Sequence, residues 1–241
     1  MLEFNRKPFN FLPLNGGELF DLTCEYSISI LERLDKQFQE LLLKTERITR
    51  NLPTPNFSEL YRDSFNSIDG IINDYSSLVK CIKLSLGEDV GKIKSKHTIF
   101  QRFSYAPDNE LQYLILHRFR NTSQHFAERL QDYQILIDPF LQLSYSGQLV
   151  NWQINFGNGG YRNSGQGTPG KETFDSENLF FQSYREESKT IIKETIRVNG
   201  IWRDILEINK LLEENLVDVI KQKNICCPPP RNVGAFVTRD Q

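Results

Sequence analysis

The chain has 241 residues, of which 39% are hydrophobic, and its 29 Lys and Arg against 31 Asp and Glu give a formal net charge of −2 at pH 7. This length and composition allow a core that needs no disulfide or metal, and the charge balance excludes a surface that is basic everywhere. Four cysteines without zinc-site spacing indicate a reducing compartment, and no stretch resembles a signal peptide or membrane span, so we expect a cytoplasmic protein without a membrane partner.

Two long amphipathic helices are predicted in the first third of the chain. Apolar residues recur every three or four positions from Phe20 to Ile48 and again from Tyr61 to Ile82, with charged residues between them. Pro53 ends the first of these patterns, and a short turn separates it from the second. Helices joined by a short turn are expected to pack antiparallel.

The rest of the chain contains two further helical patterns with β structure between them. A third helix is predicted to begin near Asp108, where a capping residue precedes a new apolar face. Alternating residues over 135–145 and 150–156 predict a β-hairpin, and 157–170 are interpreted as a loop rich in Gly, Asn and Ser. A last helix is predicted over roughly 184–222.

These elements predict a mainly α fold. The simplest way to bury four such stripes together is an antiparallel bundle of four to five helices, with a small β-hairpin insertion between the third and fourth long helices. We interpret residues 1–241 as a single helical domain, in which 132–183 form the hairpin and Gly-rich insertion and 224–241 an irregular tail.

A glycine-rich hexapeptide, Gly165-Gln166-Gly167-Thr168-Pro169-Gly170, matches the dinucleotide-binding fingerprint in its letters. That fingerprint works as the tight turn from a parallel strand into a helix N-terminus. Here it falls inside a predicted loop and contains a proline, so we interpret it as a connector. We expect neither a cofactor nor a bound metal.

The densest group of chemically capable residues is Arg120-Asn121-Thr122-Ser123-Gln124-His125. On a helix that turns about 100° per residue, Arg120, Asn121 and His125 lie away from the apolar face of the third predicted helix. We therefore expect these three side chains to point at something other than the core.

This arrangement resembles the hallmark of the higher eukaryotes and prokaryotes nucleotide-binding (HEPN) superfamily, in which Arg, a polar residue, three more residues and His follow one another on a helix. Arg120, Asn121 and His125 match its three positions. The resemblance implies an all-α bundle that dimerises so that two copies of the motif face each other across a cleft. It also implies, for many members, a metal-independent endoribonuclease of toxin-antitoxin or antiviral defence systems.

The residue types suit RNA cleavage by the 2′-hydroxyl. Histidine titrates near neutrality and can act as general base or acid, and an Arg guanidinium binds phosphate oxygens while remaining charged. Asn121 lies four residues before His125, where it can hold the imidazole or a phosphate oxygen. Auxiliary RNA-binding residues are predicted from the neighbouring basic positions: His117, Arg118, Lys92, Lys94 and Lys96.

The sequence thus favours a homodimeric, metal-independent endoribonuclease whose partner is RNA, with an antitoxin or another protein as a further partner. Two alternatives stay open. The first is a non-catalytic HEPN-like module that binds RNA, a nucleotide or a protein through the same cleft. The second is a helical oligomerisation scaffold in which Arg120 and His125 are incidental.

Overall fold

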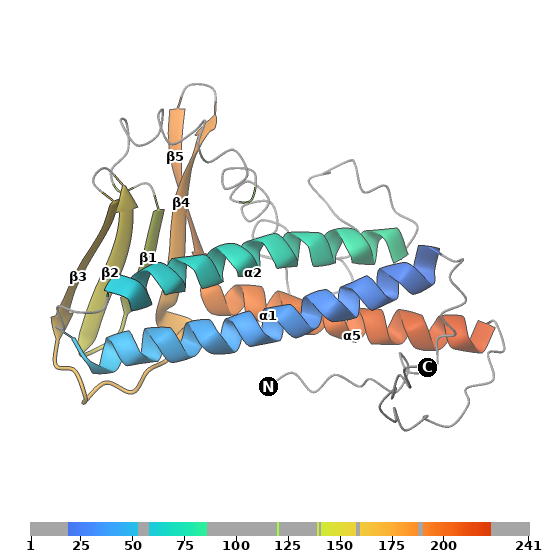
Figure 1. The fold of residues 1–241 in the computed structure, drawn as a ribbon, viewed down its shortest axis with the longest axis horizontal. Helices are drawn as coiled ribbons and strands as arrows, with labels where there is room; N and C mark the ends of the chain where they lie inside the picture. Colours follow the sequence, from blue (N-terminus) through green and yellow to red (C-terminus); the bar gives the residue numbers. More distant parts are fainter. Residues whose placement is uncertain are drawn as a thin grey trace, which may run out of the picture.

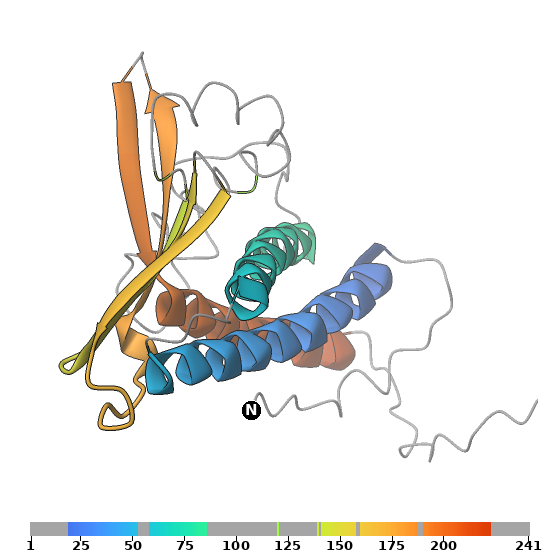
Figure 2. The same ribbon diagram turned by 60° about the vertical axis from the view of Figure 1, so that its left-hand side comes forward.

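The computed structural model describes residues 19–52, 58–85, 120, 139, 141–157, 160–187 and 190–222. Within these residues, three long helices pack against one another and a five-stranded antiparallel sheet stands at one end of them (Figure 1). Figure 2 shows from a second direction that the strands run across the helix axes rather than along them. The described chain therefore combines a helical layer with a sheet.

Helices α1 (Leu19–Arg50) and α2 (Ser58–Ser85) form the antiparallel pair predicted from their periodicity, and that prediction is confirmed. Arg33 joins them with a two-pronged ion pair, because its Nη2 and Nε donate to the two carboxylate oxygens of Asp74 at 2.8 and 3.0 Å. The facing apolar stripes are fully buried and include Ile30, Leu34, Phe38 and Leu41 on α1 and Ile68, Ile71, Ile72 and Tyr75 on α2.

The sheet contains β1 (Leu141–Ser146), β2 (Val150–Gly157), β3 (Gly160–Gly167), β4 (Leu179–Glu187) and β5 (Thr190–Arg197), in the order β3-β2-β1-β4-β5. The short 3-10 helix η3 (Ser176–Asn178) precedes β4. Alternate residues of each strand face the helices, so that Tyr145 and Trp152 pair across β1 and β2 and are buried. Trp152 Nε1 donates to Thr49 Oγ1 of α1 at 2.9 Å, which links the sheet to the helical layer.

Helix α5 (Val198–Gln222) follows β5 directly and contributes its buried Ile201, Ile205 and Ile208 to the same core. A buried hydrogen bond joins it to α2, because Tyr75 Oη donates to Asp204 Oδ2 at 2.7 Å and both side chains have no exposed surface. One cluster of buried side chains thus includes residues from all three helices and from the sheet.

The prediction of a mainly α bundle of four to five helices with a β-hairpin insertion is wrong. The predicted hairpin exists as β1 and β2, but these are two strands of a five-stranded sheet that forms one wall of the core. Of the predicted third helix, only Arg120 lies within the described residues, and it is helical.

Two misassigned segments explain this error. Residues 157–170 were expected to form a loop, yet Gly160–Gly167 form β3, because the ladder with β2 supplies backbone hydrogen bonds that require no apolar side chains. The segment from residue 184 was expected to begin the last helix, yet residues 184–187 belong to β4 and 190–197 to β5. The run Thr190-Ile191-Ile192 is β-branched, and such side chains favour strands over helices.

Candidate functional site

Arg120 is the member of the predicted catalytic set that lies within the described part of the chain. It is helical and half-buried. Its Nε is fully buried and donates a hydrogen bond to none of the described residues. A buried donor without an acceptor is unfavourable, so this N–H is available to an acceptor that a ligand would bring. The other predicted site residues lie outside the described residues: Asn121, His125, His117, Arg118, Lys92, Lys94 and Lys96.

Lys80 of α2 lies close enough to Arg120 for their positive charges to interact. The pKa of Lys80 is lowered from its ordinary value, first by burial and then by the charge of Arg120. Among the residues that the structure describes, no carboxylate forms an ion pair with either cation. Two cations that pair with no described acid create a positive potential that favours an anion.

Ser76 is a second donor on α2 without a partner among the described residues. It lies four residues before Lys80, and therefore on the same side of α2. Its side chain has no exposed surface, and its hydroxyl pairs with none of the described groups. By contrast, Ser64 and Ser77 of the same helix donate to the carbonyl four residues earlier, at 2.8 and 3.0 Å. This stretch of α2 thus contains a buried hydroxyl that none of the described groups binds.

The nearest acidic residue on α2 does not neutralise Lys80. Asp74 lies six residues earlier, on another side of the helix, where it accepts hydrogen bonds from Arg33 and from Gln37 Nε2 of α1. The hydrogen bond to Asp74 raises the pKa of Arg33. Asp74 is therefore engaged in joining α1 to α2 and does not compensate the positive charge at Lys80.

A cleft of about 900 Å³ lies between α1 and the segment that leads into η3, but its acidic residues stabilise the fold. The Glu172 carboxylate accepts the backbone N–H groups of Leu149 and Val150 at 2.5 and 2.9 Å. The Asp175 side chain accepts the N–H of Glu177 at 3.0 Å and caps η3. Because these carboxylates are engaged by backbone donors, we assign no reaction to this cleft.

Two further sequence features have structural roles. The glycine-rich hexapeptide 165–170 leads from β3 into a turn, where Gly167 and Gly170 have φ values of +139° and +82°, and it does not lead into a helix N-terminus. Cys81 of α2 is buried, and burial raises the pKa of its thiol. A thiol in this state behaves as a small apolar group rather than as a nucleophile.

Comparisons with protein-family models, curated proteins and solved structures give no match to this chain. None of the helices in the described ranges has the length and apolarity needed to cross a bilayer. Within the same ranges, no three His, Cys, Asp or Glu side chains are grouped as metal ligands. The sequence analysis identified Arg120 but missed Lys80 and Ser76, because only the fold brings α2 next to Arg120.

Proposed function

We propose that this protein cleaves RNA without a metal ion, using Arg120, Asn121 and His125 in the manner of HEPN ribonucleases. The observation that supports the proposal most directly is the pairing of Lys80 with Arg120 in the absence of a described carboxylate. A phosphodiester supplies the missing negative charge, and its two free oxygens accept hydrogen bonds from both cations. The Nε of Arg120, which pairs with none of the described residues, is a further donor of the kind that phosphate oxygens accept.

In the proposed reaction, the ribose 2′-oxygen attacks the adjacent phosphorus. A general base takes the 2′-hydroxyl proton, the bond from phosphorus to the 5′-oxygen breaks, and a general acid protonates the leaving oxygen. The products end in a 2′,3′-cyclic phosphate and a 5′-hydroxyl. His125 serves as the base or the acid, Asn121 orients it, and Arg120 with Lys80 stabilises the additional negative charge of the transition state.

The proposal does not include the helical-bundle fold, which the sheet replaces. It requires only that Arg120 and His125 reach the same phosphate. Because each chain supplies one His125, a homodimer in which two motifs face each other provides both the base and the acid. A cytoplasmic location, an antitoxin or other protein partner, and a role in defence or growth control remain part of this proposal.

Cleavage of labelled single-stranded RNA in the presence of EDTA tests the proposal. We expect the wild-type chain to release cyclic-phosphate ends, and Arg120→Ala and His125→Ala to lower the rate by about 100-fold or more. Lys36→Ala is the matched control, because Lys36 is an exposed cation of α1 that does not belong to the site. A wild-type chain that leaves a broad panel of RNAs intact, or a His125→Ala variant with full activity, contradicts the proposal.

Non-catalytic RNA binding is the second candidate function. The same cationic pair supports it, since binding a phosphate requires no proton transfer. RNA binding that depends on Arg120 and Lys80, together with intact RNA after long incubation, favours this alternative. Unchanged behaviour of an Arg120→Ala/His125→Ala double variant in both binding and cleavage assays favours the oligomerisation scaffold.

A further inference from the structure

The face of the sheet that is turned away from the helices has an unusual composition. Strand alternation places on this face of β1, β2 and β3 only Gln, Asn, Ser and Gly residues and one Arg, Arg162. This part of the face therefore has no carboxylate. Surfaces of soluble proteins ordinarily mix charges of both signs, so this face differs from an ordinary solvated surface. A negatively charged polymer that lies here meets no like charge from these three strands.

The amide side chains of this face surround a hollow of about 420 Å³, which is large enough for a nucleobase with part of its sugar. Gln142 Nε2 donates to Gln153 Oε1 at 2.9 Å and to Asn155 Oδ1 at 2.8 Å, so the three amides hold one another in place. Other polar groups from β1, β2 and β3 complete the lining. Oriented amides can form paired hydrogen bonds with the edges of bases.

Next to these amides, β4 and β5 provide surfaces for stacking. Phe180 pairs with Ser144 on one side and with Arg197 on the other. The Arg197 guanidinium lies over the Phe180 ring, 5.6 Å from its centroid, and its Nη1 donates to Glu177 Oε2 at 3.3 Å. Arg197 is thus held between a ring and a carboxylate while about half of its side chain stays exposed. A guanidinium in this position offers a flat, positively charged surface on which a base can stack.

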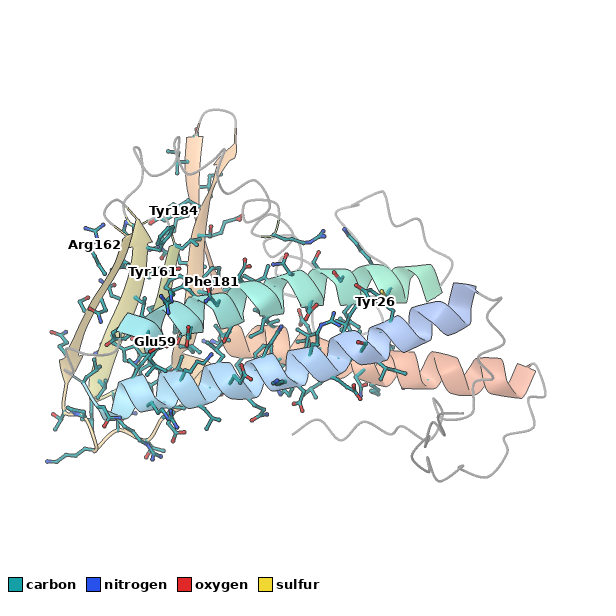
Figure 3. The ribbon with its side chains drawn as sticks, viewed as in Figure 1. Tyr26, Glu59, Tyr161, Arg162, Phe181 and Tyr184 are labelled. Carbon is teal, nitrogen blue, oxygen red and sulfur yellow. The ribbon has the colours of Figure 1, made fainter. Side chains whose placement is uncertain are left out.

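A second aromatic residue lies further along β4 on the same face. Tyr184 is half-buried, and its hydroxyl accepts a hydrogen bond from Gln182 Nε2 at 3.0 Å. Across the ladder it pairs with the exposed Lys193 of β5. Figure 3 shows Tyr184 and Arg162 on the sheet, at the opposite end of the molecule from Tyr26 of α1. Stacking groups, cations and amides therefore follow one another across a single surface.

We propose that this face binds single-stranded RNA through bases that stack on Arg197 and Tyr184 and hydrogen-bond with the amides of β1 and β2. The choice of RNA rests on the proposed function. Single-stranded rather than duplex RNA is the ligand, because base faces and edges are accessible only in an unpaired strand. The register places three cations on the surface, Arg162, Lys193 and Arg197, against two carboxylates, Glu186 of β4 and the Glu177 that binds Arg197. The remaining excess of positive charge complements the RNA backbone.

Fluorescence anisotropy with a labelled 12-nucleotide RNA tests this proposal, in a His125→Ala background that prevents cleavage. We expect Arg197→Ala and Tyr184→Ala each to weaken binding about tenfold. Arg203→Ala is the matched control, because Arg203 pairs with the same Glu177 and is equally exposed, at 52% against 49% for Arg197, but it belongs to α5. Tyr26→Ala controls for loss of an exposed aromatic residue, and both controls are expected to bind within twofold of the background.

The outcomes separate this inference from the proposed function. Binding that depends on Arg197 and Tyr184, together with a wild-type chain that cuts no RNA, supports the surface and contradicts the ribonuclease. Efficient cleavage with an unchanged KM in both variants supports the ribonuclease and overturns the surface. Equal affinity for a duplex of the same sequence also overturns it. Thermal melts confirm that each variant is folded. Arg197→Lys keeps the positive charge but removes the planar guanidinium, so a folded Arg197→Lys variant with wild-type affinity overturns the stacking role.

Discussion

The buried hydrogen bond between Tyr75 and Asp204 provides a direct test of how α2 and α5 are joined. Tyr75→Phe removes the hydroxyl that donates to Asp204 Oδ2 at 2.7 Å and keeps the ring that fills the core. The loss is thus one buried hydrogen bond to a carboxylate, and we expect the free energy of unfolding to fall by about 2 kcal/mol. For a chain of 241 residues, this corresponds to a decrease in Tm of about 4–8 °C.

Urea unfolding followed by circular dichroism at pH 7 measures this change, and the dependence of the free energy on urea should keep the wild-type slope. Tyr161→Phe is the matched control, because it removes a hydroxyl from a side chain that is 43% exposed, and we expect a change of less than about 0.5 kcal/mol. If Tyr75→Phe is as stable as Tyr161→Phe, the hydroxyl does not bind a buried carboxylate, and the packing of α2 against α5 described above is wrong.

Two further predictions concern Lys80 and the turn after β3. The pKa of Lys80 is lowered in the folded chain, so the wild-type free energy of unfolding should rise as the pH increases from that lowered value towards 10.5. We expect a rise of less than about 1 kcal/mol, and Lys80→Met should not show it. At pH 7, Lys80→Met should be at least as stable as wild type, while its RNA binding weakens. A lower free energy of unfolding for Lys80→Met at pH 7 would contradict the interpretation that no described acid compensates the charge of Lys80. Gly167→Ala should lower the free energy of unfolding by about 2–4 kcal/mol, because its Cβ would lie 2.1 Å from the Leu149 carbonyl oxygen at a φ of +139°. Gly170→Ala, with φ +82° and no atom within 4 Å of the added Cβ, should lose only about 1 kcal/mol, and equal losses in chemical denaturation would refute this reasoning.

Local sequence patterns were sufficient to predict the elements in which the order of apolar and polar side chains follows from burial of one face. The three-four repeat of α1 and α2 appears in the sequence because one face of each helix is buried along its whole length. The strict alternation in Val150–Gly157 likewise identifies β2, since one side packs on the core and the other is polar. Arg120 was selected in the same way, from its spacing to Asn121 and His125 alone.

The tertiary structure decided what depends on partners distant in sequence. Gly160–Gly167 form a strand because β2 pairs with them, and their own side chains carry almost no signal. Residues 190–197 form a strand because β4 pairs with them, although Ile191 and Val198, seven residues apart, also fit a helical repeat. The proximity of Lys80 to Arg120 also lies beyond any local pattern, because an electrostatic interaction depends on the distance between two charges and not on their separation along the chain. The sequence alone thus determined the helical hairpin and singled out Arg120, whereas the fold determined the sheet and the second cation beside Arg120.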